Sequence, residues 1–464
     1  MTVEVPTIAE AARLIETRAL SPVELLDACI RRIRAFDSKL NSFLLVTEER
    51  ARDDARRAET EIAAGKRRGP LHGIPIGHKD IYATKGIRTT GHSRILADYV
   101  PTEDATAAAK LAEAGTVLLG KLATHEFAMG GPSFDLPWPP ARNPWNTEHF
   151  TGGSSSGSGA ALAAGLILGA TGTDTGGSIR APSSFCGVVG LKPTYGLVSR
   201  RGILPLAFTM DHAGPMARTV EDCAILLQAM VGYDAMDPAS AAVEAPDYRS
   251  ALRRELRGIR VGVVRQFHEV ANPVDPEMKA AMDTALKLLA DLGAEIRDID
   301  LPPLADLDSC AMIIVLTEGF AVHAKGFRTR FNEYGRNFRD KAVLAALVSG
   351  PDYVQALRVR HRLVAEMNRA MTSVDVIVTP TTSGPAPKID SVETYGMFKR
   401  PWMTMPFNLA GLPAVSVCCG FSASGLPLGM QVVASAFDDA TALAVAHAYE
   451  QATPWHRRRP ALTA

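Results

Sequence analysis

The chain has 464 residues, 47% of them hydrophobic, and its 50 Lys and Arg residues balance 50 Asp and Glu residues. A chain of this length and composition can bury a large core, which excludes general disorder. Zero net charge provides no long-range attraction to phosphates and argues against a nucleic-acid-binding specialist. We therefore expect a compact α/β protein with no nucleic-acid partner.

The expected location follows from three negative signals. The N-terminus lacks a basic segment followed by an apolar one, so no signal peptide is predicted. The most apolar stretch, residues 160–170, is about half as long as a membrane-spanning helix, and no membrane association is expected. The six cysteines form no CxxC pattern, which is typical of a reduced protein. These signals predict a cytoplasmic protein.

The first third of the chain predicts helices and one strand. Capping boxes at Thr7 and Ser21 each start a helix, and a polar helix is expected over residues 47–65. A short apolar run then ends in His78-Lys79-Asp80. We place Lys79 at the end of a strand, where its side chain faces whatever the edge of the sheet holds.

The middle of the chain is rich in glycine and serine. Two such segments, residues 151–158 and 171–178, flank the apolar stretch 160–170. Flexible linkers would not flank a core segment, so the two loops indicate backbone held close to a reaction centre. Gly176 and Gly177 can let backbone N–H groups converge beside Ser178 and stabilise an anion.

The remaining residues predict an alternating sheet and helix arrangement. A strand over 259–263, a helix over 278–289 and a strand over 294–299 form a βαβ unit. The other expected elements are strands at 374–378, 414–418 and 428–433 and a closing helix at 440–450. No long linker and no repeat divides the chain, which favours a single domain.

A serine nucleophile needs a base in contact with it. No histidine lies in a G-x-S-x-G arrangement, which leaves Lys79 as the candidate. A lysine with the usual pKa of about 10.4 is protonated at neutral pH, so it acts as a base only when buried. Ile74, Ile76 and Ile81 make burial reasonable. The alternative is a surface pair between Lys79 and Asp80.

Eight motifs spread over the chain resemble those of the amidase signature family, and the similarity runs from about residue 5 to residue 460. They are GIPIGHKD (73–80), EFAMG (126–130), GGSSSGSGA (152–160), GTDTGGSIR (172–180), SFCG (184–187), GLKPT (190–194), DHAGP (211–215) and NLAGLP (408–413). The resemblance implies one α/β domain with a central twisted mixed β-sheet covered by helices on both faces. It implies a helical part over about 5–65, a signature core over about 70–220 and a sheet and substrate-pocket part over about 255–460.

The resemblance also implies a set of site residues. The catalytic residues would be the nucleophile Ser178, the bridging Ser154, preceded by a cis peptide bond, and the base Lys79. The oxyanion donors would be the backbone N–H groups of Thr175, Gly176, Gly177 and Ser178. Supporting or pocket positions would be Ser155, Met129, Gly130, Asp174 and Arg180, of which Asp174 and Arg180 are equally interpretable as a structural ion pair. Phe134, Trp138, Trp145 and Trp402 either line the cavity or, for the first two, form a rigid surface loop.

The implied activity is hydrolysis of a small carboxamide or N-substituted amide through an acyl-enzyme on Ser178. No metal or cofactor is implied, the partner is a small amide, and a homodimer is the family-level expectation. One alternative is the amidase subunit of tRNA-dependent glutamyl/aspartyl amidotransferase. That subunit carries an acidic residue just before its NLAGLP-containing segment, where residues 400–406 here contain none. An allophanate- or biuret-type hydrolase and, more remotely, a phosphate- or nucleotide-binding module are further alternatives.

Overall fold

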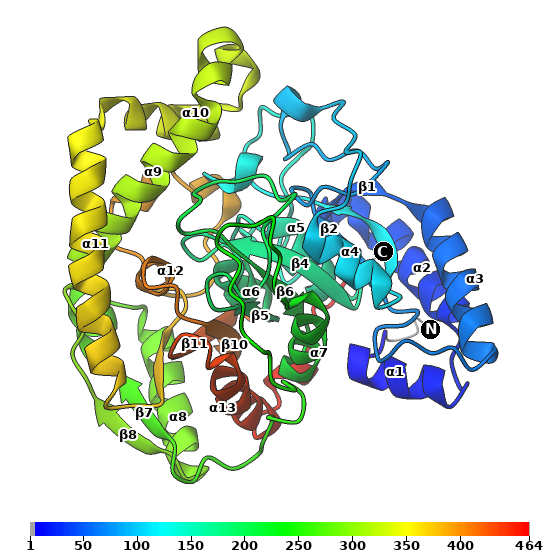
Figure 1. Cartoon of the computed structure of the whole chain (residues 1–464). Helices are drawn as coiled ribbons and strands as arrows, with labels where there is room; N and C mark the ends of the chain where they lie inside the picture. The colour runs from blue at the N-terminus through cyan, green and yellow to red at the C-terminus, as the bar shows by residue number, and fades with distance from the viewer. Residues whose placement is uncertain (1–4, 464) are drawn as a thin grey trace.

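An 11-stranded β-sheet forms the centre of the computed structural model, which describes residues 5–463 (Figure 1). The strands are β1 (Phe43–Val46), β2 (Pro75–Lys79), β3 (Val117–Leu122), β4 (Gly169–Asp174), β5 (Val189–Lys192), β6 (His212–Ala217), β7 (Arg260–Val263), β8 (Glu295–Asp298), β9 (Val376–Pro380), β10 (Ala414–Phe421) and β11 (Pro427–Ala434). Their order across the sheet is β1-β3-β2-β4-β6-β5-β10-β11-β9-β7-β8.

The sheet is mixed, as predicted. Strand β2 is parallel to β3 and β4, strand β7 is parallel to β8 and β9, and the other neighbours are antiparallel. Strands of the glycine-rich middle and strands of the C-terminal half pair directly, because β5 lies beside β10. The chain therefore forms a single mixed-sheet α/β domain.

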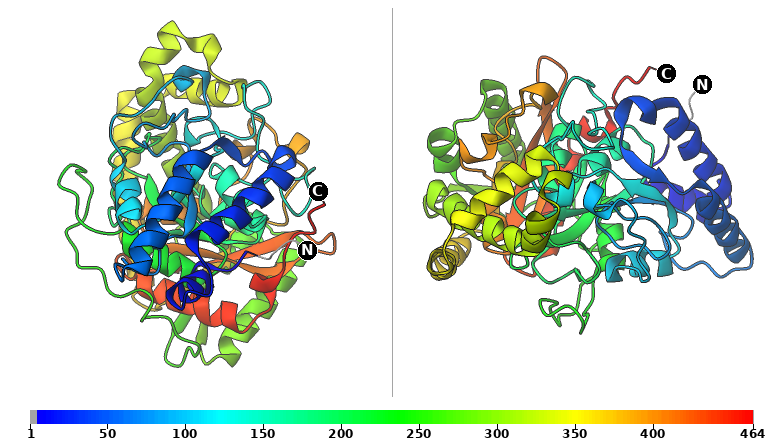
Figure 2. Two further views of the ribbon diagram at one scale, coloured as in Figure 1. Left: turned by 90° about the vertical axis from the view of Figure 1, so that its right-hand side faces the viewer. Right: turned by 90° about the horizontal axis from the view of Figure 1, so that it is seen from above.

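Helices surround this sheet (Figure 1). They are α1 (Ile8–Glu16), α2 (Pro22–Leu40), α3 (Glu48–Ala63), α4 (Thr106–Glu113), α5 (Ser156–Ala163), α6 (Arg180–Cys186), α7 (Val220–Met230), α8 (Pro276–Asp291), α9 (Leu304–Thr329), α10 (Arg336–Ala342), α11 (Gly350–Met371), α12 (Met405–Leu409) and α13 (Asp439–Gln451). The C-terminal segment returns to the N-terminal helices (Figure 2). Lys39 Nζ, in α2, donates to the carbonyl oxygen of Thr463 at 3.0 Å.

Strand β4 shows that both faces of the sheet are covered. A side chain at Gly169 would meet Leu226 of α7 and Ile8 of α1 at 3.0–3.2 Å. A side chain at Gly172 would instead meet Ile179 and Ser155, which precede α6 and α5. Residues three apart on a strand face opposite sides, so helices or their leading loops cover both faces at β4.

The predicted elements agree with the structure at most positions. Both capping boxes are present, and the predicted βαβ unit is β7, α8 and the parallel strand β8. The polar helix over 47–65 is α3. The apolar stretch 160–170 differs, because it is not one element: it contains the end of α5, a short buried turn and the start of β4.

Helix α9 is the described helix that is long and apolar enough to cross a membrane by length and composition. It has 26 residues, and 61% of its most apolar window is buried inside the chain. Core helices pass the same test, and α9 packs beside α11 and α12 (Figure 1). This helix, rather than residues 160–170, is the apolar segment of membrane-spanning length.

Candidate active site

The three predicted catalytic residues meet at one edge of the sheet. Lys79 is the last residue of β2, and Ser178 follows β4 by four residues. Because β2 and β4 are parallel neighbours, their carboxyl ends lie at the same edge, where open α/β sheets usually place their ligand sites. Ser154 reaches this edge from the loop before α5.

Lys79 is fully buried and faces two hydroxyl groups. Its Nζ lies 2.8 Å from Ser154 Oγ and 2.8 Å from Thr173 Oγ1. Burial lowers the pKa of Lys79 to about 7, although the charges of Asp174 and Asp211 act in the opposite direction. The alternative surface pair with Asp80 is wrong, since Asp80 is itself buried and lies 3.6 Å from Lys121 Nζ.

The serine-rich loop before α5 connects the catalytic groups. The peptide bond between Gly153 and Ser154 is cis, as the family resemblance implied. The backbone N–H of Ser155 donates to the carbonyl oxygen of Ser178 (3.1 Å), and the N–H of Thr173 donates to Ser155 Oγ (3.3 Å). Ser155 therefore joins the serine loop to both β4 and the segment that carries Ser178.

Ser178 lies on the surface of a cavity. Its side chain makes no hydrogen bond within 3.5 Å to residues that the structure describes, Ser154 included. Catalytic contacts are often long in unliganded enzymes and shorten when substrate binds. The placement leaves Ser178 accessible, with Ser154 and Lys79 behind it.

The loop between β4 and α6, which we call the donor loop, contains the four backbone N–H groups that were expected to stabilise an oxyanion. One of the four differs from expectation. The N–H of Gly177 donates to Asp174 Oδ1 at 2.7 Å, so a protein acceptor already occupies it. The N–H groups of Thr175, Gly176 and Ser178 have no protein acceptor among residues 5–463. The structure thus provides three unoccupied donors where four were expected.

The same loop packs tightly against the start of α12, most strictly at Gly177. Gly177 has a φ of +132°, and a Cβ there would lie 2.5 Å from Thr404 Oγ1. A Cβ at Gly176 would meet Met405 at 2.7 Å. The start of α12, with its preceding Thr404, therefore helps fix the shape of this loop.

Asp174 and Arg180 form a buried ion pair. The sequence allowed this interpretation beside a supporting role in the substrate pocket. Their Oδ1 and Nη2 atoms are 2.9 Å apart, and both residues are 0% exposed. Asn408 Nδ2 donates to Asp174 Oδ1 (2.8 Å), and Arg180 Nη1 donates to Gln431 Oε1 (2.8 Å). Burial alone would raise the pKa of Asp174, but the charge and hydrogen bonds of Arg180 hold it below its usual value. The pair ties the donor loop to α12 and β11.

A cavity of about 810 Å³ opens in front of Ser178. Small-molecule sites usually bury most of their ligand in a cavity with mainly apolar walls and a few polar groups. The walls come from 125–131, 150–154, 175–185, helices α9 and α10, and the long segment 381–405.

The predicted pocket residues divide into two groups. Met129 and Gly130 line the cavity, as expected, whereas Ser155, Asp174 and Arg180 are fully buried behind its wall. The list of lining aromatic residues differs from the candidates: Trp402 lines the cavity together with Phe150 and Phe185, while Phe134, Trp138 and Trp145 lie elsewhere.

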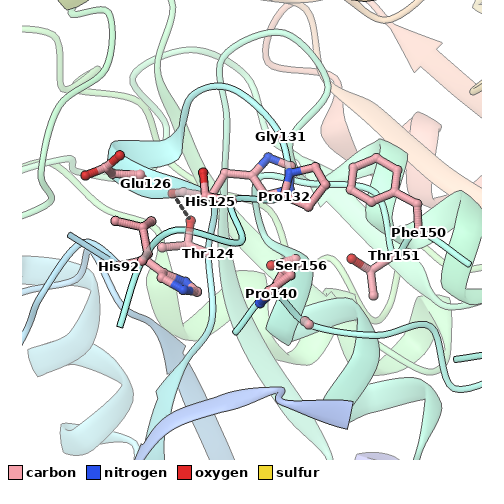
Figure 3. Close-up of a pocket in the computed structure, with 13 residues that line it drawn as sticks. His92, Thr124, His125, Glu126, Gly131, Pro132, Pro140, Phe150, Thr151 and Ser156 are labelled. Atoms are coloured by element: carbon pink, nitrogen blue, oxygen red, sulfur yellow. Dashed lines mark hydrogen bonds between the residues drawn. The ribbon is translucent and has the colours of Figure 1, made fainter. Parts of the chain in front are cut away.

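A second, water-sized cavity of about 10 Å³, whose lining residues Figure 3 shows, adjoins the first. His125, Gly131 and Phe150 border both cavities, and the His125 ring stacks on Phe150 with centroids 5.7 Å apart. Burial, with the nearby charges of Lys341 and Lys79, holds the pKa of His125 well below its usual value. The His125 ring is therefore neutral at physiological pH.

Two polar residues of the site were not predicted. Thr173, the second partner of Lys79, lies inside the GTDTGGSIR motif, and its position two residues after Thr171 places both side chains on one face of β4. Lys341 lines the cavity from α10, and no motif in the sequence marks it. Within the described part of the chain, no group of three or more His, Cys, Asp or Glu side chains is placed to hold a metal ion.

Comparisons with known proteins agree with this geometry. The family model described as Amidase matches residues 24–443. A curated relative, the A subunit of glutamyl-tRNA(Gln) amidotransferase from Roseiflexus castenholzii, is 42% identical over 98% of this chain and 97% of its own length. That name includes a tRNA and a multi-subunit enzyme, whereas the sequence led us to expect no nucleic-acid partner.

Solved structures of several different proteins are similar to this chain along nearly its whole length. A protein from a vestigial complex related to an s-triazine catabolic enzyme is 31% identical, covers 96% of this chain and 98% of its own, and has a TM-score of 0.90. The peptide amidase of Stenotrophomonas maltophilia is 32% identical, covers 98% of both chains and has a TM-score of 0.86. The family resemblance and the predicted hydrolysis of amide C–N bonds are confirmed: the chain belongs to the amidase family.

Proposed function

We propose that this enzyme hydrolyses a small amide through an acyl-enzyme on Ser178, with Ser154 and Lys79 as a proton relay. The observation that carries the proposal is the buried contact between Lys79 Nζ and Ser154 Oγ at 2.8 Å. A lysine whose pKa is lowered to about 7 is neutral in a large fraction of molecules at physiological pH. Such a lysine can accept a proton, which an ordinary exposed lysine cannot.

The reaction proceeds in two halves. Neutral Lys79 takes the proton of Ser154 while Ser154 takes that of Ser178, and Ser178 Oγ bonds to the amide carbonyl carbon. The proton returns through Ser154 to the leaving nitrogen, the C–N bond breaks, and ammonia or an amine departs. A water molecule, deprotonated by the same relay, then attacks the ester and releases the acid and Ser178.

The negative charge of the tetrahedral intermediate is stabilised by backbone donors. The N–H groups of Thr175, Gly176 and Ser178 serve this role in the proposal, because the N–H of Gly177 is held by Asp174. Removal of one such donor typically costs about 3 kcal/mol of transition-state stabilisation. Since these donors are backbone groups on a loop clamped by Asp174 and Thr404, they need no rearrangement during the reaction.

The test is an activity screen of the purified chain alone. The panel contains primary aliphatic and aromatic amides, anilides, allophanate and glutamine, and both ammonia and amine release are measured. A fluorophosphonate probe is expected to label Ser178 and to leave Ser178→Ala unlabelled. Labelling at another serine, or unchanged turnover by Ser178→Ala, would contradict the proposed nucleophile.

A second candidate is the release of ammonia from glutamine, which the names of the 42% identical relatives favour. Glutamine carries an ammonium group that needs an acidic partner. Glu393 is the one acidic side chain that lines the cavity among the described residues, and Lys399 Nζ already contacts it closely. The cavity therefore favours a substrate without an ammonium group, and efficient glutamine hydrolysis in the screen would reverse this preference. A cytoplasmic location and a homodimer stay predictions.

A further inference from the structure

A buried lysine outside the proposed relay lines the cavity. Lys341 lies in the last turn of α10 and is 2% exposed. Its Nζ donates to Asn337 Oδ1 in a short contact, and a Cβ added to Gly130 would lie 3.6 Å from the same Nζ. Gly130 is itself a cavity residue, so the ammonium group lies at the wall.

Three contacts fix α10 in this place. The N–H of Gly335, just before α10, donates to Glu126 Oε2 at 2.9 Å, and Asn337 Nδ2 donates to the carbonyl oxygen of Pro132 at 3.1 Å. Phe338 is fully buried, with its ring centroid 5.5 Å from that of Phe127. The ammonium group of Lys341 is therefore held at a defined point before any substrate arrives.

Within residues 5–463 no carboxylate is in contact with the ammonium group of Lys341, and the charge of Asp340 acts on it only from a longer distance. No carboxylate of residues 5–463 lies within 4.0 Å of Lys341 Nζ, and Asn337 offers only a neutral amide oxygen. Burial lowers the pKa of Lys341 to about 8, so the side chain remains mainly protonated at pH 7. A buried charge without a counter-ion is costly, and an anionic group of a ligand in the cavity would supply one.

Positively charged side chains outnumber negatively charged ones around the whole cavity. Its walls include Lys341, Lys399, Arg400 and the single acid Glu393, which Lys399 contacts. Arg400 is exposed at this wall and Lys341 is buried within it. The cavity thus provides two cations that no wall carboxylate neutralises.

We propose that the amide substrate carries a carboxylate and that Lys341, positioned by Asn337, binds this carboxylate. The inference rests on the proposed function, because it concerns the substrate of the same cavity. A carboxylate forms a charge-assisted hydrogen bond with an ammonium group, which is stronger than the bond that a neutral amide oxygen provides. The substrate class is therefore an ω-carbamoyl carboxylate or a related acidic amide, and Lys341 is a specificity-determining residue rather than a participant in bond breaking.

The test compares acidic amides with neutral amides of equal length. Succinamate, glutaramate and adipamate are measured beside succinamide, glutaramide and adipamide, with correction for the two amide groups of each diamide. At least one acidic amide is expected to exceed its diamide in kcat/KM by about tenfold or more, mainly through a lower KM. Equal values throughout, or a preference for the diamides, would overturn the inference without depending on any variant.

Substitutions then assign the preference to Lys341. Lys341→Met is expected to lower kcat/KM for the acidic amides by about tenfold more than for the neutral amides and so to abolish the preference, and Lys341→Arg should restore part of it. Lys325→Met, which removes an exposed lysine of α9, is the matched control and should keep the preference. If Lys341→Met fails to fold, Lys341→Gln replaces it. A preference that survives loss of the charge, or an equal loss for acidic and neutral amides, would contradict the assignment.

Fluorophosphonate labelling separates this inference from the proposed function. If Ser178 is labelled and the diamides are hydrolysed without an acidic preference, the inference alone is wrong. If Ser178 is not labelled and neither series is hydrolysed, the proposed function is wrong and the inference falls with it.

Discussion

The two walls of the cavity are built in different ways. One wall consists of short loops at the ends of β2 and β4, in which Lys79, Ser154 and the donor loop are fixed by buried hydrogen bonds. The other wall comes from α9 and α10 (Figure 1) and from residues 381–403, and it carries larger side chains, such as those of Lys341 and Trp402. We call them the loop wall and the helical wall.

The difference separates chemistry from selectivity. The loop wall supplies the backbone N–H groups and the lysine of the relay. Oxyanion stabilisation and proton transfer both depend on atomic positions that tolerate little change. The helical wall supplies charge and shape, which a few substitutions can alter without moving the relay. Substitutions in the loop wall should therefore change kcat or stability, and substitutions in the helical wall should change KM and substrate preference.

The largest effect is expected for Ser178→Ala in the loop wall. Turnover should fall by at least about 10⁴-fold, because no acyl-enzyme can form. The melting temperature should stay close to that of the wild type, since the Ser178 hydroxyl makes no hydrogen bond within residues 5–463. Ammonia release and thermal denaturation measure the two quantities. Ser156→Ala, whose Oγ donates only to the carbonyl oxygen of Ala123 at 3.3 Å, should remain active.

Lys79→Met should lower kcat by about 10²- to 10⁴-fold, the usual range for loss of a general base. In the wild type, kcat/KM for a neutral amide should rise as the pH increases through about 7, because the neutral lysine is the active form. The variant should lack this rise. A pH–rate profile of the variant with the same rise would assign it to another group.

Lys79 also gives a stability prediction with a defined sign. Its pKa is about 7 in the folded state and about 10.4 in an unfolded chain, so the unfolded state binds more protons between these values. Wild-type stability should therefore increase with pH from about 7 to about 10 relative to Lys79→Met. Urea unfolding of both proteins across this range measures the difference, and a constant difference would mean that folded Lys79 stays charged.

Asp174→Asn should destabilise the fold by about 3–5 kcal/mol, because it leaves the guanidinium of Arg180 buried without its counter-ion. Asp283→Asn is the control, since it breaks an exposed pair with Lys279 that is worth less than about 1 kcal/mol. Urea denaturation compares the two variants. Similar small losses would indicate that Asn408 and Gln431 satisfy Arg180 without the carboxylate.

The smallest effect is expected in the helical wall. Trp402→Leu keeps an apolar side chain at the cavity while reducing its size. KM should change by less than about tenfold and by different factors for aliphatic and aromatic amides, with kcat nearly unchanged. Steady-state kinetics with both amide types checks this outcome. A large loss of kcat would show that the helical wall also positions the reacting atoms.

The sequence predicted the loop wall far better than the helical wall. Lys79 and Ser178 lie in short motifs whose residue types indicate a base and a nucleophile, and the family resemblance added Ser154. The capping boxes and the βαβ unit were equally visible, because they depend on local hydrogen bonds and on hydrophobic periodicity.

The features that were missed depend on contacts between distant segments. Lys341 reaches the cavity because α10 packs against Phe127 and Glu126, which are about two hundred residues earlier in the chain. The occupied N–H of Gly177 follows from the side-chain position of Asp174, which residue order alone does not define. The stretch 160–170 could not be divided because buried helix and strand residues are equally apolar.

Lys79 is the final residue of β2, so formation of the active site depends on the register in which β2 pairs with its neighbours. In the native pairing Ile76 is opposite Gly169 and Gly77 is opposite Ala170. A slip of one residue would reverse the direction of every side chain of β2, so that His78 or Asp80 would face Ser154 in place of the lysine. Correct alignment of β2 with β4 is therefore a condition for the contact between Lys79 and Ser154, because a misaligned sheet would present a different side chain to both serines.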